Sequence, residues 1–344
     1  MRILIATDAW LPQVNGVVRT YQRLEEELSR LSHSVQFVTP NEFYTVPCPT
    51  YPEIRLAILR PKKIREVIRS FKPDVVHIAT EGPIGMAARR ACRIEKRPFT
   101  TAYHTRFPEY IAKRFPIPVR LIYKVVRLFH NKGAGTMVAT PSLARELEGR
   151  GFINLMPWTR GVDTATFKPR DCRLFGEALV AIYVGRVAPE KNLEAFLDLE
   201  IEAKKVIVGD GPSLQGLRRK YPNAEFVGAK EGEELAKCYS SGDVFVFPSR
   251  TDTFGIVLLE ALSSGLPVAA YPVTGPIDII EEGVTGCLSE DLKDAVEGAL
   301  RLDPVICREK ALQFSWERCA EIFIENLQFA EDQFEAQGLI SVPA

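Results

Sequence analysis

The fold is decided by a stretch that begins the second half of the chain, residues 179–192, LVAIYVGRVAPEKN. Its apolar run Leu179–Val184 has the length and side chains of a buried strand, and it ends in a Gly-Arg turn before a helix. Further short runs follow, separated by helical patterns: Lys205–Val208, Glu225–Gly228, Val244–Phe247 and Val268–Ala270. Short strands that alternate with helices predict βαβ units and a parallel sheet.

The first half of the chain has the same pattern. Its apolar runs are Ile3–Ala6, Val35–Val38, Val75–Ile78, Pro98–Ala102 and Gly135–Ala139. We therefore predict an α/β protein with two Rossmann-like halves. Because ligands of such sheets bind outside the carboxyl ends of the strands, two facing halves are expected to form a cleft between them.

Residues 166–178 (TFKPRDCRLFGEA) lack periodicity and contain Pro and Gly, so we expect the linker there. The expected domains are residues 1–165 and residues 166–315. A final amphipathic helix, about residues 316–336, can pack back on the first domain. The residues assigned to its apolar face are Cys319, Ile322, Phe323, Leu327 and Phe329.

The composition is that of a globular protein. Of 344 residues, 46% are hydrophobic and 26% charged, which excludes disordered and collagen-like chains. No stretch approaches 18 uncharged apolar residues, so no membrane-spanning helix is expected. The first strand is too short for a signal peptide, so none is expected there. Seven scattered cysteines without a C-x-x-C suit reduced thiols in the cytoplasm, and four histidines without a ligand cluster argue against zinc.

The net charge of zero conceals an asymmetry between the halves. Residues 1–165 carry 26 Lys and Arg against 14 Asp and Glu, a net charge of +12. Residues 166–344 carry 18 against 30, a net charge of −12. Such asymmetry suggests that one half faces an anionic partner, and nucleic acid and a membrane surface both fit. The alternative is that the two domains attract each other.

Two turns between a strand and a helix could bind phosphate. In GRVAPEKN, Arg186 leaves a strand end and Lys191 opens the next helix. Two cations there suit a diphosphate, which needs charge neutralisation as it departs, although a solvated loop with surface cations is the alternative. In PQVNGVV, Gly16 would let the backbone approach a phosphate closely, but many such turns contain glycine.

The segment PSRTDTFGIVLLEA, residues 248–261, places Asp252 before a helix and Glu260 two turns inside it. Carboxylates accept hydrogen bonds from sugar and ribose hydroxyls, and the helix start near Gly255 presents unpaired amides to anions. An unpaired carboxylate in an apolar helix would be costly to bury. The alternative is a capping Asp and a salt-bridged Glu.

Together, GRVAPEKN and PSRTDTFGIVLLEALSSGLPVAA resemble the retaining glycosyltransferases of family 4, whose GT-B fold has two Rossmann-like domains with parallel sheets facing across a cleft. The resemblance covers nearly the whole chain through PQVNGVVRT, PDVVHIATEGPIG, TAYHTRFPEY, TRGVDTATFKP, VGDGP and FVG. The family's acidic motif is usually Glu-x7-Glu, and here its first member is Asp252. That departure resembles the branch of bacterial mannosyltransferases and of glycolipid and sulfolipid synthases.

The resemblance implies roles for individual residues. Arg186 and Lys191 would bind the diphosphate of the sugar donor and stabilise the leaving nucleotide, and Gly16 would approach the same phosphates from the first domain. His104 would lie beside the anomeric carbon of the transferred sugar, although a lone histidine is usually structural. Arg160 and Asp163, in TRGVD, can simply shape the hinge.

Four more residues are expected to contact the sugar donor in the second domain. Asp252 would hold hydroxyls of the donor sugar, and the amides of Phe254 and Gly255 would contact sugar or phosphate. Glu260 would bind the ribose. No Asp-x-Asp follows a strand, and a clamp of two cations can replace a metal, so we expect no metal requirement. Retention, by same-face attack with the leaving phosphate helping to remove the acceptor's proton, is implied by the resemblance alone.

Residues 111–132 interleave basic and apolar side chains, at helical spacing from Pro118 on. This pattern is typical of an interfacial helix on an anionic membrane, and another basic run spans residues 60–72. The alternative is a helix whose apolar face packs on the sheet. The cations assigned to the acceptor or membrane surface are Lys113, Arg114, Arg120, Lys124 and Arg127.

In the family the first domain usually takes the acceptor, so a lipid acceptor is expected. The leading hypothesis is transfer of glucose, galactose or glucuronate from a UDP-sugar to a membrane lipid such as diacylglycerol. The protein would then be peripheral on the cytoplasmic face of the inner membrane, with no nucleic-acid partner. The alternative is a GDP-mannose-dependent α-mannosyltransferase acting on a lipid or polysaccharide.

Three other classes of protein fit less well. A dinucleotide-dependent oxidoreductase would need G-x-G-x-x-G after the first strand, which PQVNGVV lacks. A nucleotide-sugar epimerase fits the motifs less well. The intact set of Arg186, Lys191, Asp252 and Glu260 argues against an inactive binding protein.

Overall fold

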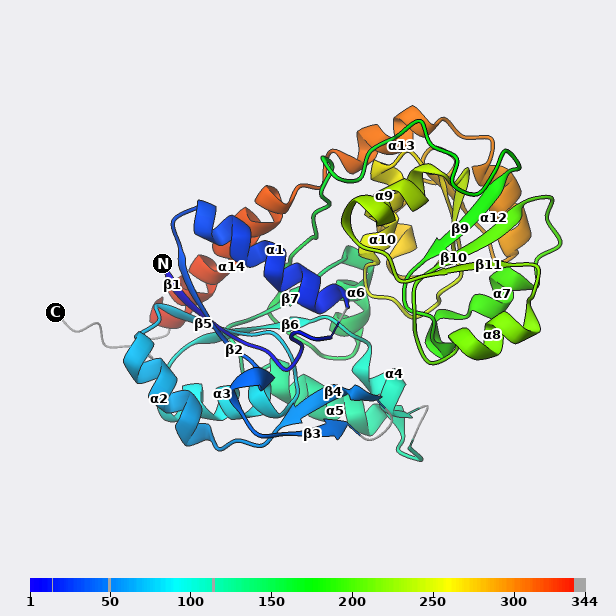
Figure 1. Cartoon of the computed structure of the whole chain (residues 1–344). Helices are drawn as coiled ribbons and strands as arrows, with labels where there is room; N and C mark the ends of the chain where they lie inside the picture. The colour runs from blue at the N-terminus through cyan, green and yellow to red at the C-terminus, as the bar shows by residue number, and fades with distance from the viewer. Residues whose placement is uncertain (14, 49–50, 113–114, 337–344) are drawn as a thin grey trace. The chain divides into compact units, whose positions relative to one another are not determined.

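The computed structural model describes residues 1–13, 15–48, 51–112 and 115–336. The chain divides into two compact units: unit 1 is Met1–Thr159 with the C-terminal segment from Glu317, and unit 2 is Arg160–Trp316. Each unit is built on a six-stranded parallel sheet with helices on both faces (Figure 1). The expected fold class of two Rossmann-like α/β halves is confirmed.

The sheet of unit 1 has the strand order β2-β1-β5-β6-β7-β8. Its strands are β1 (Arg2–Ala6), β2 (Ser34–Val38), β5 (Val75–Ile78), β6 (Phe99–Tyr103), β7 (Gly135–Val138) and β8 (Leu155–Pro157). Successive side chains of a strand point to opposite faces of a sheet. Ile3, Leu4, Ile5 and Ala6 are all fully buried, so both faces are covered. This explains why the strands are continuous apolar runs.

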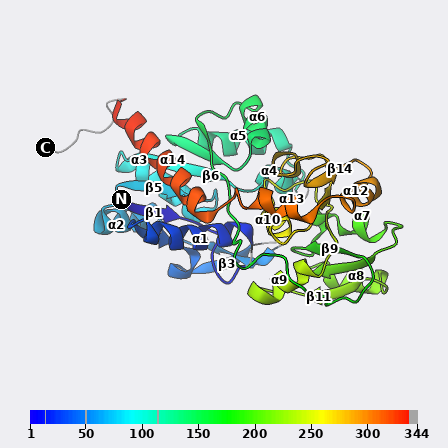
Figure 2. The same cartoon turned by 90° about the horizontal axis from the view of Figure 1, so that it is seen from above.

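Two pairs of helices cover the two faces of this sheet. Helices α2 (Pro61–Phe71) and α3 (Pro83–Ile94) pack on the face that carries Leu4 and Ala6. Helices α1 (Gly16–Arg30) and α14 (Trp316–Ala336) lie on the opposite face, as Figures 1 and 2 show. The remaining helices of the unit are α4 (Phe107–Ala112), α5 (Val119–His130) and α6 (Pro141–Gly149).

The final helix, α14, buries a stripe that is rotated from the expected one. Cys319, Phe323 and Leu327 are buried, and the Phe323 ring lies 5.0 Å from that of His77 in β5. Phe329, which was assigned to the same face, is 56% exposed. It lies six residues after Phe323, about 240° around the helix, so the assignment was wrong.

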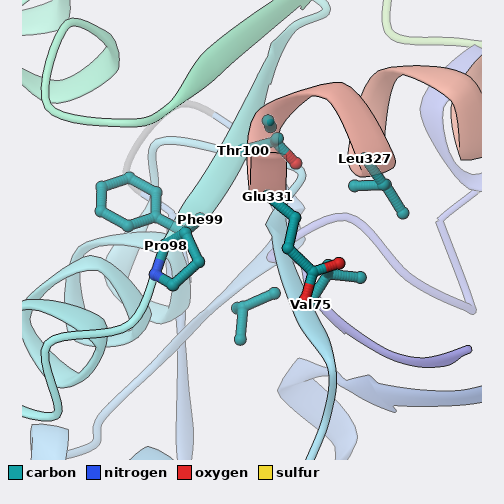
Figure 3. Close-up of a pocket in the computed structure, with 8 residues that line it drawn as sticks. Val75, Pro98, Phe99, Thr100, Leu327 and Glu331 are labelled. Carbon is teal, nitrogen blue, oxygen red and sulfur yellow. The ribbon is translucent and has the colours of Figure 1, made fainter. Parts of the chain in front are cut away.

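A small cavity lies between α14 and the strands β5 and β6 (Figure 3). Val75, Phe99, Thr100, Leu327 and Glu331 are among the residues that line it. Its volume of about 10 Å³ is no larger than a single water needs, so it is no substrate site.

Unit 1 also contains an antiparallel hairpin that the sequence pattern did not predict. Its strands are β3 (Thr45–Cys48) and β4 (Tyr51–Ala57), which follow the short helix η1 (Pro40–Glu42). Tyr44 and Ile58, at the base of the hairpin, are 90% and 63% exposed. The hairpin therefore lacks the continuous burial that makes the strands of the main sheet recognisable.

The sheet of unit 2 has the order β11-β10-β9-β12-β13-β14. Its strands are β9 (Val180–Val184), β10 (Lys204–Val208), β11 (Glu225–Gly228), β12 (Val244–Phe247), β13 (Val268–Ala270) and β14 (Gly286–Leu288). Helices α7 (Leu193–Leu197), α8 (Leu214–Lys220) and α12 (Leu292–Ala299) pack on one face. The other helices are η2 (Pro189–Lys191), α9 (Gly232–Ser240), α10 (Ile256–Ser263), α11 (Pro276–Ile279) and α13 (Pro304–Ala311).

The segment expected as a linker, residues 166–178, is part of unit 2. Phe167 is buried, and its ring packs edge-on against Tyr239 of α9, with centroids 5.6 Å apart. The Phe167 carbonyl accepts hydrogen bonds from the Ser263 hydroxyl (2.6 Å) and the Arg308 guanidinium (3.1 Å). These contacts anchor the segment to α10 and α13. Within the described ranges, no helix is long and apolar enough to cross a membrane.

Candidate functional site

Three glycine-containing segments meet at the carboxyl ends of β9, β10 and β11. The Gly185 amide donates to the Val208 carbonyl (3.0 Å), and the Gly209 amide donates to the Gly228 carbonyl (2.9 Å). Gly209 has φ +149°, and a Cβ there would overlap the Gly185 carbonyl oxygen, so only glycine fits. The sequence motifs GRV, GDG and FVG therefore converge at the edge where parallel sheets bind ligands.

Lys191 and Asp252 connect the loop after β9 to the loop after β12. The Lys191 Nζ lies 2.5 Å from the Asp252 Oδ1, and the two side chains are 19% and 18% exposed. Asn192, with φ +54°, donates from Nδ2 to the Pro248 carbonyl at 3.1 Å. The buried Asp252 Oδ2 accepts no hydrogen bond from the described residues. The structure thus brings the two strongest sequence motifs together.

Both cations of this loop have an acidic neighbour, which the sequence did not reveal. The guanidinium Nη1 of Arg186 lies 4.0 Å from Glu190 Oε1, and Lys191 is paired with Asp252. Tyr183 donates its hydroxyl to the Arg186 carbonyl at 2.9 Å. Burial, followed by the charges of Asp252 and Glu190, raises the pKa of Tyr183 well above its ordinary value, so it remains a neutral donor. An incoming diphosphate would compete with the two carboxylates for the two cations.

Helix α10 positions the remaining residues expected in the second domain. Gly255 caps its start with φ +91°, and the preceding Phe254 is 6% exposed. Glu260 is 5% exposed, and its Oε2 accepts a hydrogen bond from the Tyr239 hydroxyl at 2.8 Å. Sequence reasoning missed Tyr239, because it lies on α9 and no motif marks it.

Gly16 begins helix α1 in unit 1. The Asn15 side chain caps this helix: its Oδ1 accepts hydrogen bonds from the amides of Val17 and Val18, each at 3.0 Å. A phosphate near Gly16 would therefore share the helix start with the Asn15 side chain.

His104 follows β6 and takes part in a buried network. Its Nε2 lies 2.9 Å from the Tyr21 hydroxyl, which lies 2.8 Å from His77 Nε2. His77 Nδ1 lies 2.8 Å from the Thr100 hydroxyl. The Trp158 ring packs against His104 with centroids 5.8 Å apart. The sequence indicated His104 but neither Tyr21 nor His77.

Two acidic residues at the carboxyl edge of the same sheet were also missed. The buried Asp8 carboxylate accepts hydrogen bonds from the amides of Ile84 (2.8 Å) and Gly85 (3.2 Å) at the start of α3. Burial raises the pKa of Asp8 more than these bonds lower it. Glu81 Oε1 lies 3.0 Å from Nε2 of the buried His130. The available signal was the position of both acids just after an apolar strand.

Helix α5 is apolar on two sides. Ile122, Val126 and Phe129 are buried on the inner side, with exposures of 8% or less. Leu121, Val125 and Leu128 are 56%, 59% and 52% exposed. The sequence left two interpretations of this helix: an apolar face turned toward a membrane, or an apolar face packed on the sheet. Each describes one side of α5.

The cations assigned to this surface differ in their placement. Arg120 and Lys124 are exposed beside the outward apolar residues of α5. Arg127 donates to the Arg150 carbonyl at 3.0 Å, so it contributes less to the outward surface. Lys113 and Arg114 lie outside the described residues.

Arg160 and Asp163, in the segment TRGVD, lie at a turn. Asp163 accepts hydrogen bonds from the Thr166 amide (3.0 Å) and hydroxyl (2.9 Å), and Arg160 is 4% exposed. In the part of the chain that the structure describes, no group of three or more His, Cys, Asp or Glu could hold a metal ion.

Each half of the chain matches the model of a known protein family. Residues 14–166 match the model described as glycosyltransferase family 4, and residues 178–302 match the model described as glycosyl transferases group 1. The chain is 33% identical to a sulfoquinovosyl transferase of Arabidopsis thaliana, over 92% of this chain and 71% of that protein. It is 31% identical to a GDP-mannose-dependent α-mannosyltransferase of Corynebacterium glutamicum, over 87% of this chain and 79% of that protein.

One further relative and one solved structure are also similar to this chain. The chain is 27% identical to an α-monoglucosyldiacylglycerol synthase of Streptococcus pneumoniae, over 99% of this chain and 87% of that protein. Among solved structures, sucrose-phosphate synthase of Thermosynechococcus elongatus superposes with a TM-score of 0.76 at 20% identity. That match covers 97% of this chain and 99% of the other.

Proposed function

Because the chain belongs to glycosyltransferase family 4 and has the GT-B fold, we propose that it is a retaining hexosyltransferase with a lipid acceptor. It would move glucose, galactose or glucuronate from a UDP-sugar to a membrane lipid such as diacylglycerol. The name of the Streptococcus pneumoniae relative, a synthase of monoglucosyldiacylglycerol, supports this acceptor class. The outward face of α5 is the observation of this chain that carries it.

Unit 2 is proposed to bind the sugar donor at the carboxyl edge of its sheet. Arg186 and Lys191 would hold the diphosphate there, at the expense of their contacts with acidic neighbours. Asp252 would use its buried Oδ2 to accept a hydrogen bond from a sugar hydroxyl. Glu260, held by Tyr239, would bind the ribose.

Three backbone positions and one side chain complete the proposed contacts. The amides of Phe254 and Gly255, at the start of α10, would donate to the sugar or a phosphate. Gly16 would approach the phosphates from the start of α1. His104 would contact the sugar that is transferred.

The proposed reaction needs little covalent help from the protein. The bond between the anomeric carbon and the phosphate oxygen breaks, and the acceptor oxygen forms a bond to that carbon on the same face. The acceptor's proton passes to the departing phosphate. Arg186 and Lys191 stabilise the charge that develops on the diphosphate, which is the part a metal ion plays elsewhere. We therefore propose that transfer continues in EDTA.

The acceptor is proposed to reach unit 1 from a membrane surface. Leu121, Val125 and Leu128 would enter the boundary between headgroups and acyl chains, and Arg120 and Lys124 would contact anionic headgroups. Side chains of this type, arranged on one side of a helix, bind anionic bilayers without spanning them. We propose that the protein acts at the cytoplasmic face of the inner membrane.

The second candidate is an α-mannosyltransferase that uses GDP-mannose and a lipid or polysaccharide acceptor. The 31% identity to the Corynebacterium glutamicum enzyme of that name supports it. Both candidates would bind the diphosphate with the same two cations, Arg186 and Lys191. They differ in the base, in the sugar and, for a polysaccharide, in the acceptor.

A transfer screen tests both candidates. Purified protein is mixed with UDP-glucose, UDP-galactose, UDP-glucuronate, UDP-sulfoquinovose or GDP-mannose, with and without diacylglycerol in anionic vesicles, and with EDTA. Lipid-dependent transfer from UDP-glucose, UDP-galactose or UDP-glucuronate supports the leading proposal, whereas transfer from UDP-sulfoquinovose alone would contradict the sugars that it names. Transfer from GDP-mannose alone supports the alternative. No transfer from any of them refutes the leading proposal and the form of the alternative that uses this lipid acceptor.

Vesicle co-sedimentation tests the membrane surface. Arg120→Glu with Lys124→Glu should release the protein from anionic vesicles, because the change replaces attraction by repulsion. The matched control is Lys293→Glu with Arg301→Glu, which makes the same change of charge on exposed residues of unit 2. Equal binding of the two variants would remove α5 from the membrane proposal.

A further inference from the structure

The Tyr21 hydroxyl lies between two imidazoles. It is 2.8 Å from Nε2 of His77 and 2.9 Å from Nε2 of His104, within hydrogen-bond distance of both. His77 in turn has its Nδ1 2.8 Å from the Thr100 hydroxyl. Four side chains from α1, β5, β6 and the turn after β6 thus form one continuous chain of hydrogen bonds.

This chain is buried at one end and reaches partly exposed surface at the other. Tyr21 and His77 are completely buried, whereas His104 is partly exposed. Trp158 packs against all three rings, with centroids 5.9 Å from Tyr21, 6.0 Å from His77 and 5.8 Å from His104. Close packing of this kind leaves the rings little freedom to rotate.

A tyrosine hydroxyl has one hydrogen and accepts through its lone pairs. Toward two imidazole nitrogens it donates to one and accepts from the other. If Tyr21 donates to His77, then His104 carries its hydrogen on Nε2 and His77 donates from Nδ1 to Thr100. If Tyr21 donates to His104, then His104 carries its hydrogen on Nδ1 and His77 carries its own on Nε2. In both arrangements the two neutral histidines are opposite tautomers.

We propose that Tyr21 and His77 are positioning residues for His104. They determine which nitrogen of His104 carries the hydrogen and which edge of its ring is presented to substrate. This inference rests on the proposed function only for the role of His104 in sugar transfer; the coupling of the tautomers does not depend on it. Imidazoles whose second nitrogen is held by a hydrogen bond are fixed in tautomer and orientation in the same way.

Nitrogen NMR of the histidine rings tests the coupling directly. The chain has four histidines, so each ring can be assigned by substituting one at a time. In the wild type at pH 8, the ring nitrogens of His77 and His104 should show opposite tautomers. Observation of the same tautomer in both rings would overturn the proposal. The tautomers are read in the wild type, and the variants serve only to assign the signals.

Tyr21→Phe removes the shared hydroxyl. The ring-nitrogen shifts of His104 should then change, because its Nε2 loses the hydroxyl that lies 2.9 Å away. The matched control is Tyr123→Phe, which removes a similarly buried hydroxyl of unit 1 that donates to Glu109 at 2.6 Å. Unchanged His104 shifts in Tyr21→Phe, or equal shifts in both variants, would overturn the proposal.

Kinetics connect the coupling to transfer. In Tyr21→Phe, kcat should fall about 10- to 100-fold, as expected for a misplaced catalytic group, with KM for the sugar donor unchanged within about twofold. A rise in KM with kcat unchanged would show that Tyr21 does not act through the transfer step. If the wild type transfers no sugar, the proposed function fails while the NMR result still decides the coupling.

Discussion

Substitution of Asp252 by Asn should separate binding of the nucleotide from transfer of the sugar. Asp252 has two oxygens in different situations. Oδ1 pairs with Lys191 at 2.5 Å, and the buried Oδ2 accepts no hydrogen bond from the described residues. Asparagine keeps the shape of the side chain and removes its charge. The Lys191 ammonium then binds a diphosphate without competition from the Asp252 carboxylate.

The magnitudes follow from burial and charge. A hydrogen bond to a charged group contributes about 1.5–3 kcal/mol, so losing the carboxylate contact with a sugar hydroxyl should lower kcat/KM about 10- to 150-fold. The ion pair is about one-fifth exposed, and pairs near the surface contribute at most about 1 kcal/mol to stability. For a unit of this size that corresponds to a fall in Tm of about 2–4 °C.

The assay measures the affinity for UDP and GDP by calorimetry and the rate of transfer, in three variants. Asp252→Asn should bind the nucleoside diphosphate at least as tightly as the wild type and transfer slowly. Lys191→Ala should lose affinity and also lose turnover about 100- to 1,000-fold, because it removes a charge that stabilises the leaving group. Asp198→Asn, an exposed carboxylate elsewhere in unit 2, serves as the control. If Asp252→Asn weakens diphosphate binding as much as Lys191→Ala and still transfers at the wild-type rate, the division of roles between the two oxygens is wrong.

Three further predictions concern stability, measured by thermal and chemical denaturation. Gly209→Ala should destabilise unit 2 by more than about 3 kcal/mol, because φ is +149° and a Cβ would overlap the backbone. The control is Gly216→Ala, inside α8 with open space around it, which should stabilise the protein by up to about 1 kcal/mol. Similar effects of both substitutions would refute the steric argument. Tyr239→Phe should destabilise by about 1–3 kcal/mol, because it removes a hydroxyl that donates to the buried Glu260, and an unchanged Tm would show that this bond contributes nothing. Burial raises the pKa of Asp8, so as the pH falls the folded state takes up this proton before the unfolded chain does. Between the raised pKa and the ordinary value near 3.8, Asp8 therefore adds stability as the pH falls. The Tm of the wild type relative to that of Asp8→Asn should increase as the pH is lowered through this range. A decrease would contradict the raised pKa.

Most strands of the two main sheets could be predicted because burial makes them continuous apolar runs, but β8 (Leu155–Pro157) and β14 were missed. The bounds of β5 (Val75–Ile78) and β12 (Val244–Phe247) agree with the sequence prediction at both ends. The hairpin of β3 and β4 was missed because it contains prolines, which suit edge strands, and exposed residues at its base. The strand β14 (Gly286–Leu288) has three residues and includes a glycine, which is too little pattern to recognise.

The chemistry of the candidate site was predictable in part. Cations and carboxylates next to glycine turns indicated Arg186, Lys191 and Asp252 as candidates, from residue type and position in the sequence. Their pairing could not be predicted, because Lys191 and Asp252 are 61 residues apart and meet only through the packing of β9 beside β12. For the same reason Tyr21, 83 residues from His104, carried no signal of its own. Residue type thus indicates the chemistry available, while tertiary contacts determine which groups act together.

Helix α5 shows why periodicity could not decide between the two interpretations of the basic segment. An amphipathic helix with one apolar stripe is equally compatible with packing on a sheet and with binding to a membrane. Here apolar residues occupy two sides, so the sheet takes Ile122 and Val126 while Leu121 and Val125 stay exposed. Exposed apolar side chains beside cations on one side of a helix are the pattern on which we base the proposed membrane contact. The excess of positive charge in the first half of the sequence is consistent with an anionic surface as that partner.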